Sequence, residues 1–513
     1  MKNIKKILIL LAFTAFFTPQ AWASEAWIND LQSMFLSNNA IIYAINIRTF
    51  NAKDKNQNGI IEENLGEESG TFLNAIERLD EIKAYGINTL HVLPITPVGK
   101  VKASGTAGSL YAASSFNELN PQLKEKNSTL TLNEEAEKFI HECHNRKIRV
   151  IIDLPSCGAY DLYLKNPKLF KLDKVGNPVV PSDWTDVRLL DAGDNSKINK
   201  DVYKLYEEFT DMVIGLGADG IRADVATIKP YAFWKKLIDE TKARNPQFLF
   251  LAEASDSWKE PPSEDAVFTP YNKLLEAGFD GYYGSYFDLK NWKTAKNLYS
   301  QVNFNLGLSK KFATPKSVIG SFSTHDEVSP ILINGPQFSR MIIWLNATLP
   351  LNSYFIDGFQ TGDDYLYFWA NKKAPKTFTD DEYYFVHRGQ MDIFNFSRRP
   401  WGRHFSLLRD FVMANKFKVL NQELIANGDF ITLKTSSPSV FGYSRTYNKK
   451  TIVVIGNLDF KKGQDSKIHI PKTCDELTPI PIKIDSIPKI ARGKITTKLM
   501  PGEIQVIYFQ KFN

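Results

Sequence analysis

Cysteine is scarce in this 513-residue chain, which contains only Cys143, Cys157 and Cys474. Three cysteines allow at most one disulfide, and their wide spacing does not fit a zinc site. The sequence therefore excludes a disulfide-held scaffold, and the fold must be stabilised by a hydrophobic core. With 43% apolar and 23% charged residues, the composition is that of a globular protein, and the length is enough for one large domain and a smaller one.

Long apolar runs are also few, and the one with a basic flank lies at the N-terminus. Three lysines precede the run ILILLAFTAFF, and Ala21-Trp22-Ala23 follows as a small-residue cleavage site. This pattern predicts a signal peptide over residues 1–23, so that the mature chain begins at Ser24. The run is too short to span a membrane, and no cysteine follows it to accept a lipid. We therefore expect a secreted or periplasmic protein without a membrane anchor.

An excess of charge of one sign is missing as well. The net charge is +6, and it falls to +3 once the three lysines of the signal peptide are removed. Such a balance gives no basic footprint for nucleic acid, which is therefore not expected as a partner. Aromatic residues, by contrast, make up 13% of the chain. Their abundance suits a surface that stacks against flat ligands, although a large core uses aromatic residues too.

Strand-like runs alternate with amphipathic helices from residue 41 onward. The runs INTLHVLPI, IRVIIDLP and FLFLAEA are apolar throughout, as expected of strands that are covered on both faces. About eight such strand–helix units follow one another, which predicts an α/β fold with a closed (β/α)8 TIM barrel over residues 24–424. The Pro-, Asp- and Gly-rich residues 156–198 form a predicted subdomain inserted after the third strand. Short strands without helices predict an antiparallel β-sandwich over residues 425–513.

The run DGIRADVA places Arg222 and Asp224 on one face of a strand, because side chains alternate between the two faces. A buried arginine beside a buried aspartate is compatible with a structural ion pair. Three other acids, however, also end apolar strands: Asp153, Glu253 and Asp326. In a (β/α)8 barrel the carboxyl ends of the strands form the rim where the chemistry takes place.

Acids that converge on one rim fit the cleavage of a glycosidic bond, which needs one ionised and one protonated carboxyl group. Arg222 is expected to hold Asp224 ionised, as a nucleophile requires. Glu253 follows the apolar run FLFLA, and such a setting raises the pKa of a carboxyl group. Glu253 is therefore the expected general acid and base.

The chain resembles glycoside hydrolase family 13, the α-amylase family, over residues 40–460. Its runs GADGIRADVA, FLAEA and SFSTHDE are similar to three conserved regions of that family, in the same order. IIYAINIRTF and GINTLHVLPITPVG resemble its first two strands, and LYAASSFNELNP resembles the segment that supplies a sugar-stacking tyrosine, here Tyr111. The resemblance implies a retaining enzyme that acts on α-1,4-glucans or maltooligosaccharides.

The resemblance also implies roles for single residues. Asp224 would be the nucleophile, Glu253 the acid and base, and Asp326 would bind sugar hydroxyls and distort the reacting ring. The implied substrate-binding residues are Arg222, which orients Asp224, His325, which contacts the same sugar, Tyr111 and Asp153.

Two departures from the family pattern concern the sugar-binding positions. The family's first region ends in Asn-His, whereas this chain has Cys157 and Gly158 there. The usual Lys-His after the nucleophile is replaced by Thr227 and Ile228. Cys157 is interpreted as a small buried residue, with a reactive thiol as the alternative. The departures leave the three acids in place but put ordinary α-amylase specificity in doubt.

The run ATIKPYAFWKKLI followed by FLFLAEA is similar to the maltosyl-transferring branch of the family, whose members pass maltosyl units to or from phosphate. Hydrolysis of α-1,4-glucans is the first prediction, and transfer of a glucan or maltosyl unit is the alternative. A third reading is a carbohydrate-binding protein that has lost catalysis, and the intact set of acids speaks against it.

A loop that could bind calcium lies before the barrel rim. DKNQNGIIEE provides oxygen ligands at alternate positions and a glycine for a tight turn, as calcium sites prefer. The loop is not a complete EF-hand, because its twelfth position is a leucine. By resemblance to the calcium loop of many family members, the predicted ligands of a structural Ca²⁺ are Asp54, Asn56, Asn58, the carbonyl of Ile60 and Glu62. The alternative is a plain polar turn.

Overall fold

The computed structural model describes residues 29–55, 61–103, 108–181, 184–261, 265–363, 405–474, 477–485 and 488–510. The predicted signal peptide lies outside the described residues. Within them, no helix combines the length and the apolar character that a membrane-spanning segment needs.

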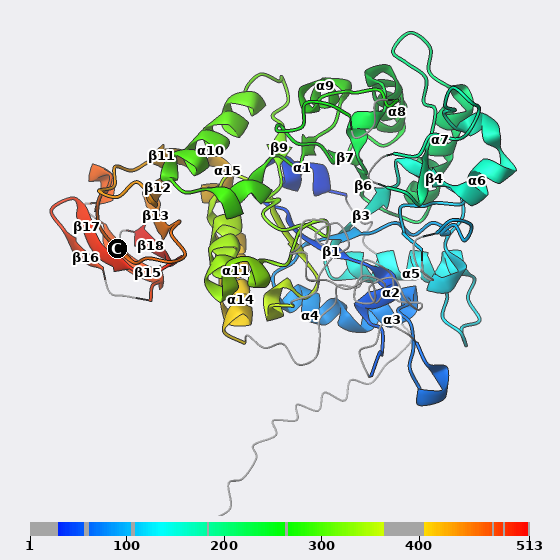
Figure 1. Ribbon diagram of the computed structural model, residues 1–513. Helices are drawn as coiled ribbons and strands as arrows, with labels where there is room; N and C mark the ends of the chain where they lie inside the picture. The colour runs from blue at the N-terminus through cyan, green and yellow to red at the C-terminus, as the bar shows by residue number, and fades with distance from the viewer. Residues whose placement is uncertain are drawn as a thin grey trace, which may run out of the picture.

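Eight parallel strands form the large domain (Figure 1). In chain order they are β1 (Ile41–Ile45), β2 (Thr89–Val92), β3 (Arg149–Leu154), β6 (Gly220–Ala223), β7 (Leu249–Ala252), β8 (Gly281–Tyr282), β9 (Ser317–Val318) and β10 (Ser353–Ile356). Each strand from β1 to β8 pairs with the next, and β10 pairs with β1. Between β9 and β10, Gly320 N–H donates to the carbonyl of Asn352 at 2.7 Å, and Asn352 N–H donates to that of Val318 at 2.9 Å. The sheet is therefore the predicted TIM barrel.

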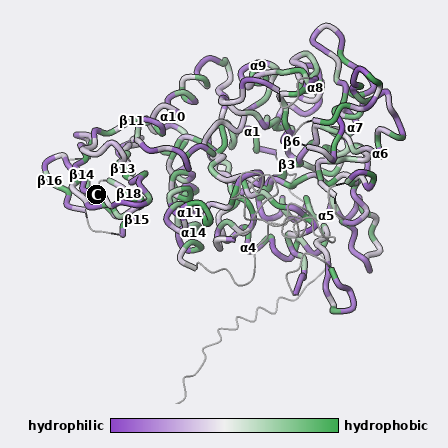
Figure 2. Tube along the Cα trace, in the orientation of Figure 1, coloured by the Kyte–Doolittle hydropathy of each residue, from purple (hydrophilic) through white to green (hydrophobic). Residues whose placement is uncertain are grey.

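Helices surround the barrel, and most of them connect one strand to the next. They are α1 (Leu31–Leu36), α2 (Ile47–Phe50), α3 (Phe72–Ala75), α4 (Leu79–Ala84), α5 (Leu132–Asn145), α7 (Lys200–Gly215), α8 (Tyr231–Arg244), α9 (Tyr271–Ala277), α10 (Ala295–Ser309), α11 (Pro330–Thr348), α14 (Phe405–Leu420) and α15 (Gln422–Asn427). Figure 2 shows hydrophobic and hydrophilic residues interleaved along these helices, as expected when one face is buried.

Helix α5 illustrates how the sequence sets such an element. Thr131 caps its N-terminus and Glu134 reaches back to the Thr131 N–H, which together form a capping box. Its buried face, which includes Ala136, Phe139 and Ile140, packs into the barrel core. The strands are therefore covered by helices on the outside and by other strands on the inside, which explains why they are apolar throughout.

A small subdomain is inserted between β3 and α7. It contains α6 (Tyr160–Lys165) and an antiparallel pair of strands, β4 (Cys157–Ala159) and β5 (Val187–Leu189). Apolar residues of this subdomain share one cluster with Val225 and Ile228, which follow β6. The subdomain therefore packs onto the carboxyl-end rim of the barrel, beside the end of β6.

The C-terminal domain consists of two antiparallel sheets that lie at one side of the barrel (Figure 1). One contains β11 (Asp429–Thr432), β12 (Val440–Tyr447), β13 (Lys450–Asn457), β18 (Ile504–Gln510) and β15 (Thr478–Lys483). The other contains β14 (Gln464–His469), β17 (Lys494–Leu499) and β16 (Lys489–Ala491). Residues of both sheets, among them Val453 and Ile507 from one and Ile468 and Ile495 from the other, form a single apolar cluster. This arrangement is the predicted β-sandwich.

Candidate active site

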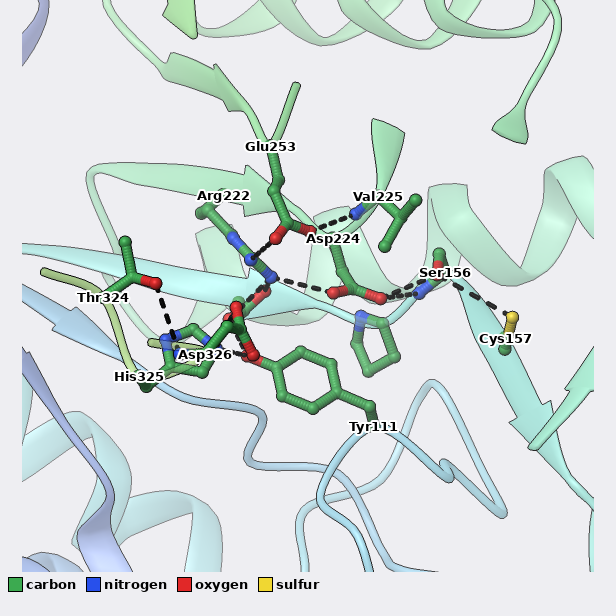
Figure 3. Close-up of polar contacts among 12 residues, drawn as sticks. Tyr111, Ser156, Cys157, Arg222, Asp224, Val225, Glu253, Thr324, His325 and Asp326 are labelled. Atoms are coloured by element: carbon green, nitrogen blue, oxygen red, sulfur yellow. Dashed lines mark hydrogen bonds and ion pairs between the residues drawn. The ribbon is translucent and has the colours of Figure 1, made fainter. Parts of the chain in front are cut away.

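Arg222 lies at the centre of the carboxyl-end rim and contacts three carboxylates (Figure 3). Its side chain is completely buried. Nη1 donates to Asp153 Oδ1 at 2.8 Å and to Asp224 Oδ1 at 3.0 Å. Nη2 lies 3.0 Å from Glu253 Oε1, and Nε donates to the hydroxyl of Tyr283 at 3.0 Å. One guanidinium thus fixes the positions of the acids that three neighbouring strands supply.

The strand register explains why these groups meet. Asp153 on β3 pairs directly with Arg222 on β6, and Leu251 on β7 pairs with Arg222 from the other side. Asp224 and Glu253 each come directly after the end of their strand, so their side chains extend beyond the rim. The predicted alternation of Arg222 and Asp224 on one face is confirmed by their direct hydrogen bond.

Ser156 holds the other oxygen of Asp224, and sequence reasoning did not single it out. The Ser156 hydroxyl donates to Asp224 Oδ2 at 2.6 Å, and its N–H donates to the same oxygen at 3.1 Å. Asp224 therefore accepts three hydrogen bonds with its two oxygens. The available signal was the position of Ser156 three residues after Asp153, at the point where β3 turns into the subdomain.

Glu253 is positioned by an unusual backbone conformation next to Asp224. Val225 N–H donates to Glu253 Oε2 at 2.6 Å. Val225 has a φ of 32°, in the left-handed region, which is rare for a β-branched residue. Strained conformations of this kind concentrate at functional sites, where the surrounding structure maintains them. The strain here directs an amide toward one of the predicted catalytic carboxylates.

A second group of side chains surrounds Asp153. Tyr111 donates to Asp153 Oδ2 at 2.7 Å and shares a 2.9 Å hydrogen bond with His325 Nε2, while the two rings stack with an angle of 7° between their planes. His91 Nε2 lies 3.1 Å from Asp153 Oδ2, and its Nδ1 lies 2.9 Å from the hydroxyl of Tyr354. The structure thus brings together Tyr111, Asp153 and His325, as predicted, and adds His91 and Tyr354. The available signal for His91 was a histidine within the otherwise apolar strand-like run INTLHVLPI.

Asp326 completes the group of acids, and it is the most exposed of them. Its side chain is 36% exposed, and Oδ2 lies 3.4 Å from Nε2 of His325. Figure 3 shows Asp326 and His325 on the same side of Arg222 as Tyr111. The three acids of the predicted catalytic set therefore surround one buried arginine.

Burial dominates the electrostatics of the acids. It raises the pKa of Glu253 well above its usual range, against the opposing charge of Arg222 and with help from Asp224 and Asp326. The pKa of Asp224 is also raised, because burial outweighs Arg222, so the expectation that Arg222 alone would keep Asp224 ionised needs correction. The two hydrogen bonds from Ser156 act with Arg222 to lower it. The stronger rise falls on Glu253, which is the order that a nucleophile and a general acid require.

The pKa values of Asp153 and His325 are also shifted from their usual values. Burial alone would raise the pKa of Asp153, but Arg222 and the hydrogen bond from His91 lower it to about 2. The pKa of His325 lies well below its usual value because of burial and the nearby Arg222. Near neutral pH the site therefore combines an ionised Asp153 with a neutral His325.

The first of the two departures from the family pattern, Cys157 and Gly158, lies on β4. Cys157 is buried, and burial raises the pKa of its thiol to about 11, as expected of an apolar residue and not of a reactive one. A Cβ atom at Gly158 would lie 2.8 Å from Cζ of Phe170. Phe170 thus occupies the space that a histidine at position 158 would need. Trp184 and Trp258 pack against the cluster formed by Cys157 and its apolar neighbours.

Replacing Arg222 by methionine should lower the free energy of unfolding by roughly 3–5 kcal/mol at pH 7. The variant leaves Asp153, Asp224 and Glu253 buried without their shared counter-charge. Urea unfolding of both proteins at pH 7 and at pH 4.5 measures the effect. The difference in free energy of unfolding between the two proteins should be smaller at pH 4.5, where protonation of the carboxyl groups relieves their repulsion. An equal deficit at both pH values would show that the loss comes from packing instead of charge.

Asp326 should make the protein less stable as the pH rises. Burial, with the charges of Asp224 and Glu327, raises its pKa to about 7 against the opposing Arg222. A raised pKa in the folded state gives stability that is complete below the usual value near 4 and is lost as the pH approaches 7. Asp326→Asn should therefore be more stable than the wild type at pH 8, by on the order of 1 kcal/mol after solvent screening, but not at pH 4. Parallel stability–pH curves for the two proteins would contradict this.

The predicted calcium loop falls mostly outside the described residues. Asn56, Asn58 and Ile60 lie there, whereas Asp54 and Glu62 are described. Glu67 joins the two ends of the loop, since its carboxylate accepts the N–H of Lys55 and that of Glu62, both at 2.9 Å. The described residues contain no group of three or more acidic, histidine or cysteine side chains placed to hold a metal ion. The oxygen-rich ligand set still suits calcium, and its binding stays a prediction.

Comparison with known proteins finds relatives among maltosyltransferases. No protein-family model matches the chain. An α-1,4-glucan:maltose-1-phosphate maltosyltransferase of Corynebacterium glutamicum is 22% identical over 428 residues, which cover 78% of this chain and 57% of the relative. The enzyme of the same name from Rhodospirillum rubrum is 23% identical, over 78% of this chain and 56% of the relative. The chain covers less than two thirds of the length of these curated relatives.

Solved structures share the fold over nearly the whole chain. A maltogenic α-amylase of Thermotoga neapolitana matches with a TM-score of 0.67 and 18% identity, over 93% of this chain and 99% of that one. An α-amylase of Lactobacillus plantarum matches with a TM-score of 0.66 and 18% identity, over 92% and 99% of the two chains. The predicted resemblance to the α-amylase family, and within it to maltosyl-transferring enzymes, is therefore confirmed.

Proposed function

We propose that this protein is a retaining enzyme that acts on α-1,4-glucans and transfers maltosyl units to an acceptor other than water. The observation on which the proposal rests is the pair formed by Asp224 and Glu253 across the guanidinium of Arg222. Retaining glycosidases need two carboxyl groups close together on opposite sides of the bond that breaks. Glu253 has the more strongly raised pKa, which suits the acid of such a pair.

In the proposed reaction Asp224 attacks the anomeric carbon of the donor sugar, and a bond between this carbon and a carboxylate oxygen forms. The glycosidic C–O bond breaks, its electron pair goes to the leaving oxygen, and Glu253 supplies the proton. Glu253 then removes a proton from the acceptor hydroxyl, which attacks the same carbon and releases Asp224. Asp326, His325 and the other predicted binding residues would hold the donor sugar during both steps.

Two features support transfer over the hydrolysis that the sequence favoured first. The curated relatives that align over 78% of the chain are named maltosyltransferases. The cluster beside Asp224 is apolar; it includes Cys157, Val225 and Ile228, and two tryptophans pack against it. An apolar, aromatic wall favours the face of a sugar over a water molecule. The histidine of the family's first region has no room beside this wall, because Phe170 occupies the space next to Gly158.

Product analysis of the purified chain on maltoheptaose, with and without inorganic phosphate, tests this proposal. We expect longer and shorter maltooligosaccharides, or maltose 1-phosphate when phosphate is present, without a net gain of reducing ends. A steady gain of reducing ends under both conditions would establish hydrolysis instead. Intact maltoheptaose that nevertheless binds the protein would favour the carbohydrate-binding reading.

We also propose that the protein is exported and that its N-terminal loop binds a structural calcium ion. The basic and apolar N-terminus and the oxygen ligands of residues 54–62 support these two points. Neither the signal peptide nor the calcium loop takes part in the proposed reaction, because both precede the strands that supply the acids.

A further inference from the structure

The peptide group of Ser156 lies between Asp224 and a buried lysine. On one side, the hydroxyl and the N–H of Ser156 both donate to Asp224 Oδ2. On the other side, the carbonyl of Ser156 accepts a 2.7 Å hydrogen bond from Nζ of Lys229. The hydroxyl of Tyr206 lies 3.2 Å from the same carbonyl and 3.0 Å from that of Pro155. The hydroxyl, the N–H and the carbonyl of Ser156 thus all take part in the contacts between Asp224 and Lys229.

Lys229 is an unusual residue to find in this place. It follows the single turn of 3-10 helix η5 (Ala226–Ile228), five positions after Asp224, and the chain folds back so that its side chain is completely buried. A buried ammonium group is costly unless it is paired. Nζ of Lys229 donates its hydrogen bond to a neutral carbonyl. Burial lowers the pKa of Lys229 to about 8, and the nearby Cys157 and Asp224 oppose this shift.

We propose that Ser156 and Lys229 act together as positioning residues for Asp224. Lys229 holds the Ser156 peptide, and Ser156 holds the Asp224 carboxylate in the orientation and the ionised form that nucleophilic attack requires. This inference rests on the proposed function and assigns a role to two residues for which the resemblance implied none.

Several ionisable groups face Asp224, and each affects how it titrates. They are Arg222 on β6, Asp153 on β3, Glu253 after β7, Asp326 after β9, Tyr111 after β2, Cys157 on β4, Tyr206 on α7 and Lys229 after η5. The hydrogen bonds from Ser156 favour the ionised form of Asp224 and so lower its pKa. Removing those bonds should therefore raise the pH at which Asp224 becomes ionised.

The chain offers a matched control pair at the opposite end of the barrel. Lys418 is also buried, and its Nζ donates to the carbonyls of Asn346 and Leu351 and to the hydroxyl of Ser353. Ser353 is the first residue of β10, so this Lys–Ser pair lies at the amino-end rim. Losses that arise only from unfolding or poor packing should be similar in the two pairs.

The test measures the release of fluoride from α-maltosyl fluoride by the whole chain as a function of pH. Fluoride leaves without a general acid, so kcat/KM on its acidic limb follows the ionisation of the nucleophile. We expect Ser156→Ala to lower kcat/KM at neutral pH by roughly 10- to 100-fold and to move the acidic limb up by about one pH unit. Lys229→Met should act in the same direction, by about tenfold, and Ser156→Thr should restore most of the activity.

The controls Ser353→Ala and Lys418→Met should leave the acidic limb in place. If all four variants behave alike, or if the limb does not move in Ser156→Ala, Ser156 and Lys229 are structural residues only. A wild type that releases no fluoride contradicts the proposed function instead. In that case, the protonation of Asp224 can be followed with a diazoacetate ester, which esterifies protonated carboxyl groups. Peptide mass spectrometry measures the extent of labelling at Asp224 as a function of pH. The pH of half-maximal labelling must be higher in Ser156→Ala and Lys229→Met than in the two controls.

Discussion

Asp224→Ala should lose on the order of 10⁴- to 10⁶-fold in kcat on α-maltosyl fluoride, because no other group can form the covalent intermediate. The substitution also leaves a space beside the anomeric carbon, on the side from which the carboxylate attacks. Sodium azide should enter this space, form a bond to the anomeric carbon as fluoride leaves, and restore part of the turnover. Since only one displacement takes place, the product should be β-maltosyl azide, the inverted anomer.

Asp326→Ala is the matched control for this experiment. Asp326 belongs to the same group of acids, but in the proposed reaction it binds the sugar and makes no bond to it. Azide should therefore not rescue that variant, and no β-azide should form. If azide rescues Asp326→Ala and fails to rescue Asp224→Ala, the nucleophile is Asp326 and not Asp224.

The barrel and its acids could be predicted because their signals are repeated along the chain. Apolar runs alternate with amphipathic helices over several hundred residues, so an error in one element leaves the fold class unchanged. The acids follow from position, since each stands at the end of a predicted strand, and parallel strands bring their carboxyl ends to one rim. The hydrogen bond between Arg222 and Asp224 confirms the alternation that the sequence indicated.

Ser156, Lys229 and the backbone of Val225 were not predictable in the same way. Ser156 and Lys229 are 73 positions apart, and no local pattern links a serine after a proline to a lysine after an isoleucine. Valine favours extended conformations, so its sequence context gave no sign of the left-handed φ that directs its amide to Glu253. The pKa of Asp224 was misjudged for a related reason. Its value depends on how completely the carboxylate is buried, and a contact with Arg222 alone does not determine that.

Glu253→Gln should separate the two halves of the reaction. On maltoheptaose we expect a loss of about 10²- to 10⁴-fold, because the leaving oxygen no longer receives a proton. On α-maltosyl fluoride the first half should survive, since fluoride needs no proton, and one equivalent should be released in a burst. The second half needs a base, so a maltosyl group should accumulate on Asp224, where peptide mass spectrometry can detect it. The carboxamide keeps the shape of the side chain, and binding of maltoheptaose should therefore be retained.

Azide also distinguishes Glu253→Gln from Asp224→Ala. Azide needs no base, so it should attack the maltosyl group on Asp224 in Glu253→Gln and release α-maltosyl azide, the retained anomer. The two variants should thus give opposite anomers from the same two reagents, because one reacts by a single displacement and the other by two. Glu327→Gln is the control, since Glu327 forms an ion pair with Lys290 beside the site and should behave as the wild type. The same anomer from Asp224→Ala and Glu253→Gln would contradict the assignment of nucleophile and acid to these two residues.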